Sequence, residues 1–274
     1  MNNNHRTSQI RYISVDGQKP LEIVGDIVEE ALVCISVNGA ELATFMCTPA
    51  DLDKLALGFL YNEGIIQNVD DVRRLHISKA TTCVDVWLRD SEYERPSRAI
   101  ITSGCGGGVT FDDLSGKHEP LQSDLSADPE QIAGLMQQML SNASAYRTAR
   151  GIHTAALAEK DQILLQVEDV GRHNCLDKLC GAALQAGIHT HDRILISSGR
   201  ISSEMINKAR RLGTPIICSR TSPTSLSVAL AESWNMTIVA YVRQKRMRIY
   251  TRPERVLDSS FIAASSVSNG DVHE

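Results

Sequence analysis

A single cysteine, Cys105, stands among four glycines in the stretch ITSGCGGGVTFDD at residues 101–113. Glycine has no Cβ and tolerates positive φ, so the neighbouring residues cannot bury this thiol and the loop is free to swing. Because the thiolate is the reactive form of cysteine, nearby basic groups would activate Cys105 for nucleophilic or sulfur-carrying chemistry. The alternative is a tight glycine turn in which the cysteine is incidental.

Three arginines form a second set of candidates, because each follows a predicted strand and precedes a predicted helix. They are Arg172 in DVGRHN (169–174), Arg200 in SGRISS (198–203) and Arg220 in SRTSPT (219–224). Loops after parallel strands gather at one edge of a sheet, where helix N-termini with free N–H groups attract anions and guanidinium groups bind phosphate. Each arginine alone is better explained as a solvated loop charge. Their recurrence, beside the basic segment YVRQKRMRIYTRPER (241–255), favours a phosphorylated or nucleotide-like ligand.

Familiar nucleotide and zinc motifs are missing from the sequence. Neither GxxxxGK[ST] nor GxGxxG occurs, and the HxE and PCxxC patterns of zinc deaminases are absent. We therefore expect no zinc, and we expect His189 and His191 to be surface residues of a loop. Position 108 is glycine, so Cys105 has no partner in a CxxC pair and a thioredoxin-like redox role is disfavoured.

The composition bounds the class of protein. The chain has 274 residues, 42% of them hydrophobic and 22% charged, which is typical of a globular protein in water. Its net charge of −5 gives no general attraction for nucleic acid. The N-terminal MNNNHRTSQIRY has no apolar region and no apolar run approaches 18 residues, so we expect no signal peptide, no membrane span and a cytoplasmic protein.

The seven cysteines are scattered, and we expect reduced thiols rather than a disulfide framework. Cys34, Cys83 and Cys218 lie in predicted strands and are interpreted as small core residues. Cys175 and Cys180 share a predicted helix and are interpreted as inert for the same reason.

The N-terminal part has a mixed pattern. We expect the first ten residues to be disordered and ALVCISV (31–37) and ELATFM (41–46) to form a hairpin around Asn38-Gly39. Thr48 is the predicted N-cap of a helix that ends at Gly64 and buries Leu52, Leu55, Phe59 and Leu60. Residues 76–88 are predicted to form two strands in which Val84, Val86 and Leu88 point inward. Residues 96–129 are predicted to be irregular. A helix is predicted to begin at Asp128 and to extend to about Ser144.

Strands and helices alternate in the C-terminal part, which predicts a mostly parallel sheet covered by helices. The predicted strands are 162–168, 193–198, 215–219 and 236–242, and the predicted helices are 174–187, 202–213 and 222–234. The predicted fold class is α/β, with a smaller α+β portion at 1–125 that carries the Cys105 loop and an α/β domain at 126–274.

Over nearly its whole length the chain resembles the FdhD-type accessory sulfurtransferases of formate dehydrogenase maturation. The resemblance lies in VNGAELATFMCTPADLDKLALGFLYNEGII, GIHTAALA, DVGRHNCLDKL, SGRISSEMINKA, SRTSPTSLSVALA and VAYVRQKRMRIYT, in this order. It implies a cytidine-deaminase-like three-layer fold without the zinc ligands. It also implies that a cysteine desulfurase loads a persulfide onto Cys105, which passes the sulfur to the molybdenum bis(molybdopterin guanine dinucleotide) cofactor before the cofactor enters apo formate dehydrogenase.

The resemblance further implies a homodimer and cofactor contacts near the C-terminus, with GDP as a mimic of one end of the cofactor. The cofactor-binding residues are then Tyr241, Val242, Arg243, Gln244, Lys245 and Arg246, together with Arg172, Arg200 and Arg220. One departure from the family concerns the loop, which commonly reads CxxC: Gly108 stands in place of the second cysteine. A two-thiol mechanism would need a distant cysteine such as Cys47.

Two other classes of function stay open. Cys105 with His153 or His173 and Asn174 has the composition of a cysteine-nucleophile hydrolase, whose members need to meet only in space. The chain is alternatively a cofactor chaperone without chemistry, in which Cys105 has no role.

Overall fold

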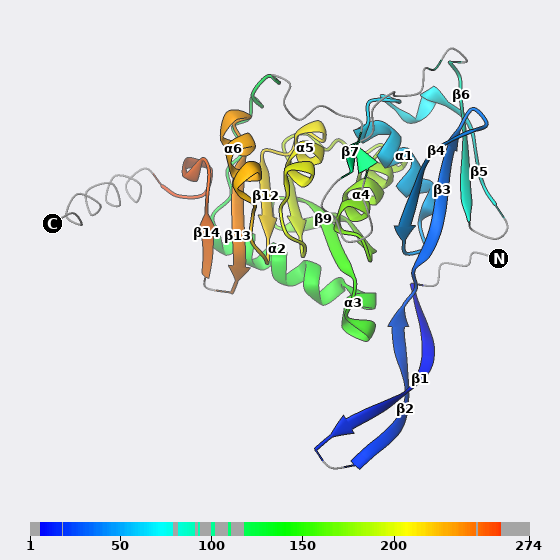
Figure 1. Cartoon of the computed structure of the whole chain (residues 1–274). Helices are drawn as coiled ribbons and strands as arrows, with labels where there is room; N and C mark the ends of the chain where they lie inside the picture. The colour runs from blue at the N-terminus through cyan, green and yellow to red at the C-terminus, as the bar shows by residue number, and fades with distance from the viewer. Residues whose placement is uncertain are drawn as a thin grey trace. The chain divides into compact units, whose positions relative to one another are not determined.

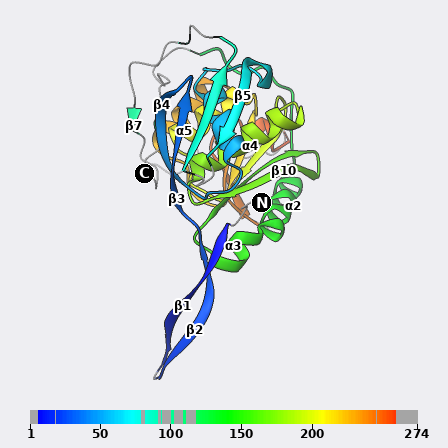
Figure 2. The same cartoon turned by 90° about the vertical axis from the view of Figure 1, so that its right-hand side faces the viewer.

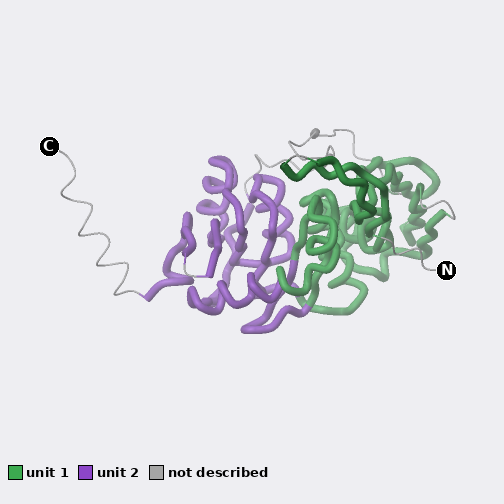
Figure 3. Tube along the Cα trace, turned by 90° about the horizontal axis from the view of Figure 1, so that it is seen from below, with its two compact units in different colours: residues 1–113, 140–155, 165–189 green, residues 114–139, 156–164, 190–274 purple. Residues whose placement is uncertain are grey.

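The computed structural model describes residues 6–17, 19–78, 82–90, 93, 100–101, 109–110, 118–244 and 246–258. The chain divides into two compact units, coloured in Figure 3. Unit 1 comprises Met1–Asp113, Leu140–Ala155 and Leu165–His189, and unit 2 comprises Leu114–Met139, Ala156–Leu164 and Thr190–Glu274. The predicted domains were two continuous segments, 1–125 and 126–274. Each observed unit instead combines three separate segments of the chain.

Unit 1 begins with an antiparallel hairpin of β1 (Thr7–Asp16) and β2 (Lys19–Val28), paired from Thr7↔Val28 to Asp16↔Lys19. The hairpin extends away from the rest of unit 1 (Figures 1 and 2). The prediction that the first ten residues are disordered is wrong for Thr7–Ile10, which lie in β1. Polar residues of this stretch pair with β2, so a polar beginning did not prevent strand formation.

A four-stranded sheet in the order β4-β3-β6-β5 follows. Its strands are β3 (Ala31–Val37), β4 (Ala40–Cys47), β5 (Val72–Ile77) and β6 (Cys83–Leu88). The hairpin predicted around Asn38-Gly39 is confirmed, and both turn residues have positive φ, at 50° and 84°. The inward positions Val84, Val86 and Leu88 are also confirmed, since they are only 0–7% exposed.

Helix α1 (Leu52–Asn62) packs its predicted apolar face against this sheet, with Leu55, Phe59 and Leu60 fully buried. Thr48 is not its N-cap. That position belongs to Asp51, which has φ 54° and makes no side-chain capping bond. The Thr48 hydroxyl instead accepts the backbone N–H of Val170, 122 residues away in sequence.

Helix α4 (Arg172–Ala186) packs on α1, and unit 1 contains four further short elements. They are η1 (Val69–Asp71), β7 (Ile100–Ile101), β8 (Val109–Thr110) and α3 (Ser144–Ala149). The segment 96–129, predicted to be irregular, thus contains two short strands, which pair antiparallel. Helix α4 ends before Gly187, as predicted, and this glycine has φ 63°.

Three elements have residues in both units. They are α2 (Pro129–Asn142), β9 (His153–Glu159) and β10 (Gln162–Asp169). Strands β9 and β10 are hydrogen-bonded neighbours. The predicted start of α2 is confirmed, because Asp128 Oδ1 accepts the N–H of Gln131 at 2.8 Å. The predictions included β10 but not β9.

Unit 2 has the alternating pattern that the sequence predicts. Its elements are β11 (Ile194–Ser197), α5 (Ser203–Arg211), β12 (Ile216–Ser219), α6 (Ser225–Ser233), β13 (Thr237–Arg243), β14 (Arg246–Ile249) and η2 (Pro253–Arg255). Strands β11, β12 and β13 are parallel, which confirms the predicted sheet, and β14 adds an antiparallel edge. Helices α5 and α6 lie side by side (Figure 1).

Candidate functional site

The predicted sulfur carrier, Cys105, lies outside the residues that the structure describes, as does Gly108. The described residues that flank it in sequence belong to β7 and β8, where Ile101 lies opposite Val109. The role of Cys105 therefore stays a prediction, and the structure bears on it through the other six cysteines.

Four of those six cysteines are buried thiols: Cys47, Cys175, Cys180 and Cys218 are 0–1% exposed. Burial and the nearby carboxylate of Asp169 raise the pKa of Cys47 to about 12. Burial, followed by Asp169, likewise raises the pKa of Cys175, and burial alone raises that of Cys218. All three are therefore protonated at neutral pH, which argues against Cys47 as a second reactive thiol.

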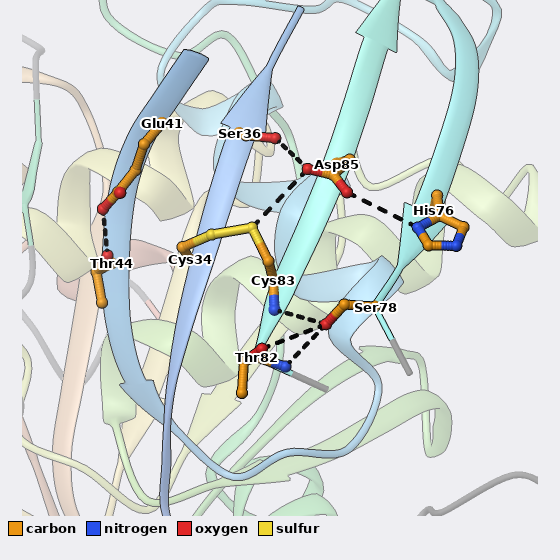
Figure 4. Close-up of a disulfide and its surroundings, with 9 residues drawn as sticks. All are labelled: Cys34, Ser36, Glu41, Thr44, His76, Ser78, Thr82, Cys83 and Asp85. Carbon is orange, nitrogen blue, oxygen red and sulfur yellow. Dashed lines mark hydrogen bonds and ion pairs between the residues drawn. A yellow bond between two sulfur atoms is a disulfide. The ribbon is translucent and has the colours of Figure 1, made fainter. Parts of the chain in front are cut away.

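The remaining two cysteines contradict the interpretation as reduced core residues, because Cys34 and Cys83 form a disulfide (Figure 4). They lie directly opposite each other on the neighbouring parallel strands β3 and β6, with their Cα atoms 4.4 Å apart. Both occupy the face of the sheet opposite to the inward residues Val84 and Val86 and are partly exposed. Sequence separation concealed this pairing, which depends on strand register.

A buried polar cluster in unit 1 centres on Asp169, the last residue of β10. Its Oδ1 accepts the N–H of Gly171 at 2.7 Å and the side-chain amide of Asn174 at 2.9 Å. Its Oδ2 accepts the N–H of Thr48 at 3.1 Å. The carboxylate thus joins the loop before α1 to the N-terminus of α4, where a negative charge is favourable.

The counter-ion of Asp169 is Lys178, which lies on α4 and is fully buried. Its Nζ is 2.5 Å from Asp169 Oδ2 and donates to the carbonyl of Thr48 at 2.9 Å. Sequence reasoning missed this pair. The available signal was a lysine among the apolar residues of NCLDKLCGAALQ, because a buried charge needs a partner.

The first predicted anion-binding arginine, Arg172, is at the start of α4 and only 5% exposed. It is thus a buried cation in unit 1 and not a solvated loop charge. Burial and then Arg172 lower the pKa of His153, an effect that Asp169 opposes. Asn174 donates to Met46 O and to Asp169, so these two bonds of its side-chain amide serve the local structure.

The other two predicted arginine loops meet within unit 2. The N–H of Ile201 donates to Ser222 O, and the N–H of Thr224 donates back to Ile201 O. The hydroxyl of Ser219 donates to Gly199 O at 2.6 Å, at the end of β12. The structure therefore brings the Arg200 and Arg220 loops together, with Arg200 exposed and Arg220 half-buried.

The helices after these loops offer fewer free donors than the sequence suggests. Ser202 Oγ accepts the N–H of Met205 in α5, and Thr224 Oγ1 accepts the N–H of Ser227 in α6. These two N–H groups are capped by the chain's own side chains, so the expectation of free donors is wrong for them.

The end of β13 joins the same loops. Arg243 Nη1 donates to Arg220 O at 2.7 Å, and the N–H of Tyr241 donates to Thr221 O at 3.1 Å. Tyr241 has φ 53° at a bulge of β13, and its ring lies 4.4 Å from the guanidinium of Arg248. A positive φ on a tyrosine is uncommon and concentrates at functional sites.

Among the remaining predicted contacts, Val242 is buried, Gln244 and Arg246 are exposed, and Lys245 lies outside the described residues. The two loops, the end of β13 and the start of β14 contribute to what we call the arginine edge, which consists of Arg200, Arg220, Tyr241, Arg243 and Arg246. Its exposed guanidinium groups can bind an anionic ligand.

Two findings limit other kinds of site within the described part of the chain. No cluster of three or more His, Cys, Asp or Glu side chains there is arranged to hold a metal ion. No helix there combines the length and apolar character needed to cross a membrane.

Parallel and antiparallel sheets covered by helices define a mixed α/β protein. A family model, described as the FdhD/NarQ family, matches residues 28–257. The chain belongs to this family.

Similar proteins extend over most of the chain. A sulfur carrier protein FdhD from Halalkalibacterium halodurans is 36% identical over 254 residues, 90% of this chain and 94% of that protein. The one from Bacillus subtilis is 34% identical over 236 residues, 84% of this chain and 90% of that protein. A crystal structure of a presumed formate dehydrogenase accessory protein from Desulfotalea psychrophila has a TM-score of 0.76 and 25% identity, covering 92% of this chain and 100% of the other.

Proposed function

We propose that this chain is a sulfur carrier that serves formate dehydrogenase in the cytoplasm. It accepts sulfur from a cysteine desulfurase as a persulfide on Cys105 and delivers it to the molybdenum bis(molybdopterin guanine dinucleotide) cofactor, the substrate of the second transfer. Membership of the FdhD/NarQ family and relatives named as sulfur carriers support this function.

The main observation in favour of Cys105 as the carrier is that each of the six described cysteines is either buried or disulfide-bonded. Four are buried, and Cys34 and Cys83 are bonded to each other. In the proposed transfer, the Cys105 thiolate attacks the outer sulfur of the desulfurase persulfide. The sulfur–sulfur bond of the donor breaks, the desulfurase leaves as a thiolate, and Cys105 holds the new persulfide.

Mass spectrometry of the intact protein tests this assignment. After incubation with a cysteine desulfurase and cysteine, the parent protein gains about one sulfur, roughly 32 Da, as a persulfide. Cys105→Ala gains none and does not activate apo formate dehydrogenase. The double variant Cys34→Ser/Cys83→Ser is the matched control and loads normally. Full activation by folded Cys105→Ala would refute the assignment.

We further propose that the arginine edge binds the guanine nucleotide end of the cofactor. Its support is that two of the predicted loops and the end of β13 are hydrogen-bonded together. Arg172, which is buried in unit 1, is proposed separately as a contact of the cofactor. The Arg243→Ala/Arg246→Ala variant should bind GDP at least about tenfold more weakly by calorimetry, because two charge-assisted contacts are removed.

The control for GDP binding is Arg11→Ala, which removes an exposed arginine of the β1–β2 hairpin and should leave GDP affinity unchanged. Added salt should weaken binding to the parent protein, since exposed charges are screened over about 8 Å at physiological ionic strength. Unchanged GDP affinity in the double variant, or no GDP binding at all, contradicts this part of the proposal.

The proposal includes a homodimer and a cytidine-deaminase-like arrangement of the α/β sheet. The β1–β2 hairpin supports the dimer, because one of its faces carries the apolar side chains of Ile10, Tyr12, Leu21 and Ile27, all 40–64% exposed. An isolated two-stranded ribbon is marginally stable, and burial against a second copy would stabilise it.

The hydrolase alternative receives no support from the described residues. Asn174, its orienting residue, donates its amide to Met46 O and to Asp169. A chaperone without chemistry predicts no gain of sulfur, so the mass measurement separates it from the carrier.

A further inference from the structure

We propose that Cys34 and Cys83 form a second thiol site, a dithiol–disulfide pair that undergoes exchange with dithiol reductants on the outer face of the four-stranded sheet, with Cys34 as the thiolate released first. This site is independent of sulfur loading on Cys105.

The position of Cys34 and Cys83 on the sheet makes the pair accessible to a reductant. The inner face of the sheet packs Val33, Ile35 and Val84 against α1, all fully buried. Cys34 and Cys83 alternate with these residues and therefore lie on the other face, where both are partly exposed. The four free cysteines of the described chain are buried, so Cys34 and Cys83 are the only described cysteine residues that are partly exposed. An exchange reaction requires such access.

The surroundings of the pair are polar on the side of β6 and β5 (Figure 4). Asp85 lies two residues after Cys83 on the same face, and its Oδ1 is 3.9 Å from Cys83 Sγ. The hydroxyl of Ser36 donates to the same carboxylate oxygen at 2.5 Å. His76 Nδ1 lies 3.7 Å from Asp85 Oδ2.

The Asp85 carboxylate makes the two sulfurs unequal. It is a neighbour of Cys83, and a negative charge on that sulfur is therefore disfavoured relative to Cys34. In the described part of this face the other charged or titratable groups are His76 and Arg74 on β5 and Glu41 on β4. The Oε1 atom of Glu41 accepts the hydroxyl of Thr44, which lies opposite Cys34.

The exchange then has a preferred direction. A reductant thiolate attacks Cys83 Sγ and forms a mixed disulfide with it. The Cys34–Cys83 bond breaks, and its electron pair leaves with Cys34 as a thiolate. The second thiol of the reductant then attacks the reductant sulfur that is bonded to Cys83. This closes the disulfide of the reductant and releases Cys83 as a thiolate. The two protons of the dithiol end on Cys34 and Cys83, so the pair is reduced and the dithiol is oxidised.

The parent protein gives the first test. It is incubated under native conditions with excess dithiothreitol, alkylated and mapped by peptide mass spectrometry, while circular dichroism follows the fold. We expect Cys34 and Cys83 to be alkylated in the folded protein and the four buried cysteines only after unfolding. Reduction of the pair only at denaturant concentrations that unfold the protein would make it a structural staple and overturn the proposal.

Variants that keep only one cysteine of the pair test the direction. Cys83→Ser and Cys34→Ser, each combined with Cys105→Ala, leave one thiol of the pair to react with an aromatic disulfide. Cys34 should react faster than Cys83 by no more than about twofold, because the Asp85 carboxylate is at most one sulfur–sulfur bond nearer to Cys83 than to Cys34 and acts through water. Asp85→Asn should remove most of the difference, and Thr44→Ala, the control, should not. Equal rates, insensitive to Asp85, would refute the assigned direction.

Discussion

Asp169 and Lys178 show how far one buried pair can organise a loop junction. Each is 0% exposed, and together they bind the backbone of Thr48 on both its N–H and its carbonyl. Removing one partner leaves the other as an uncompensated buried charge. The pair therefore holds the start of α4 to the segment before α1.

Lys178→Met should lower the free energy of unfolding by about 3–5 kcal/mol, because Asp169 then stays buried without its counter-ion. Lys54→Met is the matched control, since Lys54 pairs with Asp51 at a partly exposed site and should change stability by less than about 1 kcal/mol. Urea unfolding of both variants measures this. A loss for Lys178→Met no greater than that of the control would contradict the role of the pair.

His153 should make stability depend on pH. Its pKa in the folded chain is below the ordinary 6.5, because burial and Arg172 disfavour the imidazolium and outweigh Asp169. As pH falls through 6.5, the unfolded chain binds a proton that the folded chain does not, so stability decreases. In His153→Gln the free energy of unfolding should vary less between about pH 7 and pH 5. An unchanged slope in urea titrations would contradict this.

Single residues also show what the sequence could and could not predict about the site. Asn38-Gly39 determines a turn by itself, because both residues accept positive φ, and this prediction is confirmed. The Thr48 carbonyl that Lys178 binds is 130 residues away in sequence, the Val170 N–H that the Thr48 hydroxyl accepts is 122 residues away, and the disulfide partner of Cys34 is 49 residues away. Local pattern contains no information on such pairs, and the Thr48 and Cys34 predictions were wrong for this reason.

The contact between α1 and α4 depends on two glycines. A Cβ on Gly58 would clash with the backbone carbonyl of Asp177, and one on Gly181 would clash with that of Lys54. Neither obstacle is a flexible side chain, so the helices would have to separate.

Gly58→Ala should therefore destabilise the protein by at least about 2 kcal/mol. Gly134→Ala in α2 is the matched control, because nothing lies within 4 Å of the added methyl group. It should stabilise the protein by about 0.5–1 kcal/mol through helix propensity. Thermal unfolding of both variants measures the contrast, and equal midpoints would show that the close approach is not required.

The β1–β2 hairpin leads to a prediction about assembly. Tyr12→Ser/Leu21→Ser removes two large side chains from its apolar face and should shift the proposed dimer toward monomer in sedimentation. Ser8→Ala, on the same face, is the control. A parent protein that is monomeric at all concentrations, or a variant that stays dimeric, would rule out this use of the hairpin.

The positions of helices and strands were easier to predict from the sequence than the burial of their residues. The strands and helices of unit 2 follow from alternating apolar patterns, and Met205, Ile206 and Ala209 of α5 are fully buried. The hairpin β1–β2 was missed because its apolar residues are exposed and its first residues are polar. The burial of Arg172 was missed because it depends on the packing around the start of α4, where Asp169 and Lys178 are also buried. Only the tertiary structure assembles this packing.

The proposed chemistry of the whole molecule involves three groups. The carrier thiol is proposed at Cys105, outside the described residues, the disulfide proposed to be exchangeable belongs to the sheet of unit 1, and the arginine edge belongs to unit 2. Of the nine predicted cofactor contacts, the structure connects the Arg200, Arg220 and β13 segments, while Arg172 belongs to unit 1.

The central claim is that Cys105 alone carries sulfur. Its most direct test loads the parent protein with isotopically labelled cysteine sulfur through a desulfurase, blocks persulfides by alkylation, and maps the label by peptide. The account predicts that the label lies on the peptide containing Cys105, with none on peptides containing Cys47, Cys175, Cys180 or Cys218. Label on any of those four peptides, or an unlabelled Cys105 in active protein, would contradict it.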